Sequence, residues 1–169
     1  MSAADEAYAA AEAEIARAAA AGETKLYFNN DRFRGLDRLP PSLADLTGLQ
    51  ILNLTNTRIS DVAPLAALTG LQTLYLDGTQ VADLRPIAGL DSLGDNSPLG
   101  LLYRDTPATR RDARLATLAQ IDDMAERSRE TLAYLRSLPP WPEPYTPEAT
   151  PDGSPPQPIG GTPEPPGQD

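Results

Sequence analysis

Two neighbouring stretches of this chain match position by position, and this repeat limits the possible folds more than any other feature. The first copy begins at Leu46 and reads LTGLQILNLTNTRISDVAPLAA, and the second begins at Leu68 and reads LTGLQTLYLDGTQVADLRPIAG, a period of 22 residues. A unit this short cannot bury its own apolar side chains, so successive copies have to stack and share one core. The sequence therefore predicts a repeat architecture.

Apolar residues recur at the same places in both copies. They are Leu49, Leu52, Leu54, Ile59, Val62 and Leu65 in the first copy and Leu71, Leu74, Leu76, Val81, Leu84 and Ile87 in the second. This spacing predicts a short strand, a turn and a tight return segment whose apolar side chains enter the shared core. Pro64 and Pro86 favour a return that is not a full helix, because proline has no backbone N–H. We expect Asp61 and Asp83 to cap that return.

The resulting pattern, LxxLxLxxTxIxDVxPLxxL, resembles the 22-residue leucine-rich repeats of bacterial internalin-like proteins. The resemblance covers roughly half of the chain. Such repeats usually carry Asn where this chain has Thr57 and Thr79, and we expect the two hydroxyls to bond the turn backbone. The resemblance implies an α/β fold, a short solenoid, and a concave sheet of the kind that commonly binds partners.

Less regular copies flank the two matched ones. Leu26, Phe28 and Phe33 take the places of Leu52, Leu54 and Ile59 at an offset of 26, and Leu101, Tyr103, Thr106 and Ala108 take those of Leu74, Leu76, Thr79 and Val81 at an offset of 27. The second offset is 27 rather than 22, so we place an insertion near residues 94–98. Residues 24–107 are thus predicted to form about four parallel strands.

The segments on either side of the repeats are predicted to be capping helices. Residues 1–23 are rich in Ala, the best helix former, and Asp5 and Glu6 lie in the first turn, where the helix dipole favours carboxylates. Residues 108–138 show apolar side chains at helical spacing and predict a single amphipathic helix. A repeat stack has to cover the open ends of its core, which both helices would do.

Residues 139–169 hold most of the chain's 18 prolines and few aliphatic residues. Such a stretch buries too little apolar surface to offset the entropy of ordering it, so we expect a disordered, acidic tail or linker. Within it, we expect Trp141 and Tyr145 to dock inside the molecule or to stay exposed.

Composition excludes most enzyme mechanisms and several kinds of partner. The chain has no Cys and no His, so Ser-His and Cys-His nucleophiles and Cys-based zinc sites cannot be built. We predict no catalytic residue, no cofactor and no metal, and a protein that is not an enzyme. The net charge of −10 opposes binding to nucleic acid or to anionic membranes. Because we recognise neither a signal peptide nor an apolar span, we expect the protein in the cytoplasm. We also expect it to be a monomer.

Strand residues that point away from the core form columns across the predicted sheet. The predicted partner-binding residues on this concave face are Tyr27, Asn29, Asn53, Thr55, Tyr75, Asp77, Leu102 and Arg104. Aromatic and apolar side chains with polar neighbours are typical of the centre of a protein interface, although strand propensity alone also favours Tyr. We therefore expect a non-catalytic module that binds an unidentified protein partner.

Two alternative functions stay open at this point. The first is that the chain is the targeting portion of a larger enzyme or effector, because many bacterial repeat proteins carry their activity in another domain and the Pro-rich segment resembles a linker. The second is that the chain is a structural remnant without a partner, since only two copies of the repeat match well.

Overall fold

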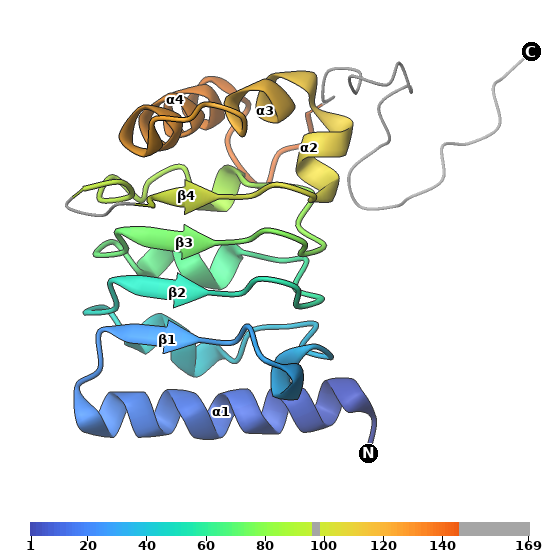
Figure 1. Cartoon of the computed structure of the whole chain (residues 1–169), viewed down its shortest axis with the longest axis vertical. Helices are drawn as coiled ribbons and strands as arrows, with labels where there is room; N and C mark the ends of the chain where they lie inside the picture. Colours follow the sequence, from blue (N-terminus) through green and yellow to red (C-terminus); the bar gives the residue numbers. More distant parts are fainter. Residues whose placement is uncertain (96–98, 146–169) are drawn as a thin grey trace, which may run out of the picture.

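A parallel sheet between two helical ends forms the body of the protein in the computed structural model, which describes residues 1–95 and 99–145 (Figure 1). Its strands β1 (Lys25–Tyr27), β2 (Ile51–Asn53), β3 (Thr73–Tyr75) and β4 (Leu101–Leu102) follow one another in chain order. The four predicted parallel strands and the offsets of 26, 22 and 27 are confirmed by the register of the pairs. The predicted insertion lies partly outside the described residues, as do residues 146–169 of the predicted tail.

Each of the first three strands is followed by at least one 3₁₀ helix, and these return segments form the side of the stack that we call the helical side. The return segments are η2 (Pro41–Asp45), η3 (Ala63–Ala67) and η4 (Arg85–Ile87), while η1 (Asp31–Phe33) lies in the turn directly after β1, against α1. Proline stands in the first turn of η3 and of η4. The Asp61 carboxylate accepts the N–H of Ala63 at 2.8 Å, and the Asp83 carboxylate accepts the N–H of Arg85 at 2.9 Å. Both aspartates therefore bond the start of the return, as predicted.

The turn after each of the last three strands is tied by a buried threonine. Thr57 Oγ1 donates to the Leu54 carbonyl and Thr79 Oγ1 to the Leu76 carbonyl, both at 2.7 Å. In the last copy Thr106 makes the same bond within its own turn, at 2.8 Å. The predicted role of the repeat threonines is thus confirmed.

One continuous core lies between the strands and the 3₁₀ helices. All twelve apolar positions predicted from the two matched copies are 0% exposed, and their counterparts in the flanking copies are buried as well. Phe28 and Phe33 meet edge to face in the first copy, with ring centroids 4.7 Å apart. Because each copy supplies one layer of this core, no copy has a core of its own.

Helix α1 (Ala3–Ala21) lies along the β1 end of the sheet (Figure 1). Ser2 and Asp5 form a capping box at its start, and Gly22, with a φ of 65°, ends it in the left-handed conformation. Its inner face is mostly alanine: the buried residues are Ala7, Ala11, Ile15 and Ala18. These small side chains let the helix backbone approach the repeats closely.

Three helices stand where the sequence predicted one over residues 108–138: α2 (Pro107–Arg111), α3 (Ala113–Leu118) and α4 (Met124–Ser137). The prediction of a single helix was wrong because two aspartates interrupt it. Asp112 leaves the helical conformation and its carboxylate accepts the N–H groups of Arg114 and Leu115, at 2.9 and 3.3 Å. Asp123 does the same at the start of α4, accepting the N–H of Glu126 at 2.7 Å. Short acidic side chains offer the backbone this alternative to continued helix.

None of the helices in the described ranges combines the length and the apolar character that crossing a membrane requires.

Candidate binding face

The side chains that the strands direct away from the helical side form one surface, which we call the open face. Its central row crosses the whole sheet, because Tyr27 pairs with Asn53, Asn53 with Tyr75, and Tyr75 with Leu102. The predicted second row, Asn29, Thr55, Asp77 and Arg104, lies just beyond the strand ends, where the Arg104 N–H bonds the Asp77 carboxylate. The structure therefore places four of the eight predicted residues in one row of paired strand residues, and each of the other four lies two residues further along the chain, beyond a strand end.

The central row of the open face carries two tyrosines and a leucine. Tyr27 is 48% exposed at one end, while Tyr75 and Leu102 are half-buried. Burial raises the pKa of the Tyr75 phenol above its ordinary value, and the neighbouring Tyr27 raises it further. Both observations describe a row of neutral, amphipathic side chains, which contribute contact area at a low desolvation cost.

Two of the predicted residues use their side chains to accept hydrogen bonds from backbone N–H groups of the open face. Asn53 is only 9% exposed, and its side-chain oxygen accepts the N–H of Thr55 at 2.9 Å. The Asp77 carboxylate accepts the N–H of Arg104 at 2.7 Å. Burial raises the pKa of Asp77, while this bond and the charge of Arg104 lower it. Asn53 and Asp77 therefore position the row that contains Thr55 and Arg104.

Two α4 residues that sequence reasoning missed bond the outer edge of β4. Arg127 is 3% exposed and donates to the carbonyls of Leu101, Leu99 and Ile121 at 2.9, 3.0 and 2.8 Å. Ser128 Oγ accepts the N–H of Leu101 at 3.0 Å. Burial lowers the pKa of the Arg127 guanidinium, with the nearby Arg104 charge as the second cause. An arginine in an amphipathic helix ordinarily indicates a solvated face, so nothing in the sequence marked this one.

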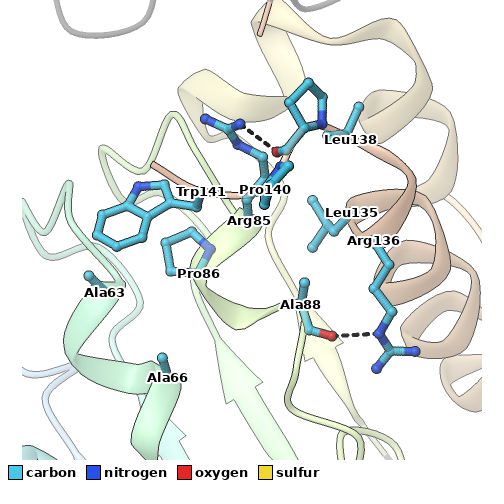
Figure 2. Close-up of a pocket in the computed structure, with 11 residues that line it drawn as sticks. Ala63, Ala66, Arg85, Pro86, Ala88, Leu135, Arg136, Leu138, Pro140 and Trp141 are labelled. Carbon is cyan, nitrogen blue, oxygen red and sulfur yellow. Dashed lines mark hydrogen bonds between the residues drawn. The ribbon is translucent and has the colours of Figure 1, made fainter. Parts of the chain in front are cut away.

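A groove of about 540 Å³ lies on the helical side, between η3, η4, the end of α4 and residues 139–141 (Figure 2). Its walls are mainly apolar, with Ala63, Pro86 and Trp141 among them, and the polar groups are those of Arg85 and Arg136. No carboxylate lies among these lining residues, so the groove lacks the paired acid and base of general acid–base catalysis. Within residues 1–95 and 99–145, no group of three acidic side chains is placed to hold a metal ion.

Comparison with known proteins identifies the repeats. Residues 47–92, from the turn before β2 to just beyond η4, match the family model described as leucine rich repeats in two copies. No curated protein matches the chain. Leucine-rich repeats are generally protein-interaction modules and typically have no catalytic activity of their own. Residues 47–92 therefore carry two leucine-rich repeats, and the four-stranded parallel sheet with its helices fits an α/β repeat fold.

Proposed function

We propose that this protein is a non-catalytic module that binds a protein partner through the open face, as the concave side of a short solenoid. The observation that carries the proposal is the central row, in which Tyr27 on one side of the largely buried Asn53, and Tyr75 and Leu102 on the other, present apolar surface. Aromatic side chains of this kind dominate the binding energy of protein interfaces.

Rigidity is the proposed source of affinity. Each strand is backed by core residues that are 0 or 1% exposed, and Asn53 and Asp77 fix the adjacent row through the backbone. Side chains held in place before the partner arrives lose little freedom on binding, so less of the contact energy is offset by ordering.

The size of the open face sets the expected strength of the contact. Four strands about 4.8 Å apart give a patch only ~15–20 Å wide. A standard interface buries about 800 Å² on each partner, so the strands alone support a weak contact. We therefore propose that the exposed Asn29 and Arg104, beyond the strand ends, enlarge it.

The remaining parts of the chain have structural roles in this proposal. Helices α1 and α2–α4 act as the two caps, since α1 lies along β1 and α4 bonds the outer edge of β4 (Figure 1). The bacterial internalin-like class, the monomeric state and the cytoplasmic location stay predictions from the sequence and belong to the same proposal.

The test is an affinity capture with immobilised wild-type protein and two variants, read by mass spectrometry. Tyr75→Asp places a charge in the middle of the central row, and Ala66→Asp places the same charge on the exposed part of η3, on the helical side. A central aromatic contributes about 2 kcal/mol or more, so we expect Tyr75→Asp to weaken capture at least ~30-fold. Ala66→Asp should capture as wild type does.

Circular dichroism spectra of all three proteins should coincide, which separates loss of binding from loss of fold. Equal capture by Tyr75→Asp and wild type contradicts the assignment of the open face. If wild type itself enriches no protein, the interaction module is contradicted and a remnant without a partner is favoured.

A further inference from the structure

Arg85, in η4, is an arginine that the fold buries almost completely. It is 6% exposed, and the Asp83 carboxylate binds its Nε at 3.0 Å and its Nη2 at 2.7 Å. The remaining nitrogen, Nη1, points at residues that follow α4. It donates to the carbonyl of Pro139 at 2.7 Å and to that of Glu143. A guanidinium with fixed fork geometry suits this simultaneous contact.

Residues 139–145 contact Arg85 at a third point as well. The guanidinium carbon lies 4.5 Å from the centre of the Tyr145 ring, a cation–π contact. The N–H of Glu143 donates to the Pro140 carbonyl at 2.8 Å, and this turn brings the Pro139 and Glu143 carbonyls to one nitrogen. Burial raises the pKa of the Tyr145 phenol, in keeping with its covered position.

We infer that residues 139–145 form a strap that Arg85 latches onto the helical side of the repeats, and that this strap opens and closes independently of α4. In the closed position Trp141 lies beside Pro86, with Ala63 of η3 beyond it (Figure 2). The strap thus crosses from the end of α4 over η4 toward η3. This inference does not depend on the function proposed for the open face.

Two contacts make an open strap compatible with an intact fold. Asp83 keeps its bonds to Arg85 when the strap leaves, so the cation stays paired. Arg136 independently holds α4 to the segment just after η4, through the Ala88 carbonyl at 2.9 Å and the Asp91 carboxylate. Opening therefore breaks only the strap's own contacts and uncovers Arg85 and Pro86.

The latch also holds the end of the strap. Tyr145, the last residue that the structure describes, is held against Arg85 of η4 on the helical side. A closed strap therefore covers Arg85 and Pro86 on the helical side of the repeats.

Cleavage by chymotrypsin after Tyr145 measures strap opening in the full-length protein. The cut separates residues 146–169, and its rate is read by mass spectrometry under native conditions. Loss of charge-assisted hydrogen bonds and of a cation–π contact shifts such an opening equilibrium by about tenfold or more. We expect Arg85→Ala to raise the rate of this cut by that factor. Arg129→Ala, which removes an exposed arginine of α4, should leave it unchanged.

A second variant and an internal reporter keep the test decisive. Arg85→Lys retains the charge that pairs with Asp83 but lacks the planar guanidinium that reaches two carbonyls. Chymotrypsin should therefore cut Arg85→Lys after Tyr145 faster than wild type, which keeps the test valid even if Arg85→Ala does not fold. Tyr27, which is 48% exposed within β1, reports on the repeats. If the folded Arg85 variants are cut after Tyr145 at the wild-type rate, Arg85 does not hold the strap closed. A rise of equal size at Tyr27 overturns independent opening, because Arg85 would then stabilise the whole fold.

Discussion

Replacing Arg127 by Met should unfold the protein far more easily than replacing any exposed arginine of the same helix. The Arg127 guanidinium is buried and holds three backbone carbonyls, two of which belong to the segment of β4. Methionine has a similar length and apolar stem but no donor. The change therefore removes the hydrogen bonds while leaving most of the packing of α4 in place.

The size of the effect follows from these contacts. A hydrogen bond to a charged group contributes about 1.5–3 kcal/mol, so three bonds set an upper bound of ~5–9 kcal/mol. Two effects reduce the loss: the variant no longer buries a cation, and water reaches some of the freed carbonyls. We therefore expect a net loss of about 3 kcal/mol, a large part of the ~5–15 kcal/mol by which domains are stable.

Urea unfolding followed by circular dichroism tests this prediction. With a slope of about 1–3 kcal/mol per molar urea, the midpoint should fall by ~1–3 M for Arg127→Met. Arg129→Ala on the exposed side of α4 should stay within about 0.5 kcal/mol of wild type. Equal midpoints for the two variants would show that α4 is held by apolar packing alone and that the bonds to β4 contribute nothing.

Two further predictions concern buried hydroxyl groups. Thr79→Val removes the 2.7 Å bond to the Leu76 carbonyl and should lower the free energy of unfolding by about 1–2 kcal/mol, measured with urea. An unchanged urea midpoint would show that this bond does not stabilise the fold. Burial raises the pKa of Tyr103 to about 12 in the folded protein, while an unfolded tyrosine ionises near 10. The unfolded state therefore releases its proton first as the pH rises. The free energy of unfolding should fall between about pH 10 and about pH 12. Thermal unfolding across this range should show a steeper loss for wild type than for Tyr103→Phe; parallel curves would contradict the shift.

The repeat period predicted the core and the register because both follow from local spacing. A position that is apolar in every copy has to face the shared core, and the offset between copies directly gives the strand partner, as for Tyr75 and Leu102. The same offsets placed Tyr27, Asn53, Tyr75 and Leu102 in one row across the sheet. They did not reveal that Asn53 and Asp77 bond backbone N–H groups, since this depends on side-chain rotamers.

The misses have two physical origins: local competition from polar side chains, and hydrogen-bond acceptors that are distant in sequence. The apolar spacing over 108–138 continues through Asp112 and Asp123, so periodicity alone does not show that their carboxylates interrupt the helix. Arg127 and Arg85 are buried because carbonyls 26 and 54 residues away in sequence come to them. Local sequence patterns contain no information about such distant acceptors.

The bonds between α4 and the last strand also determine how the sheet can meet other molecules. Leu101 turns both its N–H and its carbonyl outward, and Ser128 and Arg127 occupy the two groups. A strand from another chain, or an additional repeat inserted after β4, would first have to displace α4. Exposed strand edges are the usual starting points of β-sheet aggregation, and natural proteins often cover them. At this end the sheet is closed to growth, so a partner has to approach it from a face.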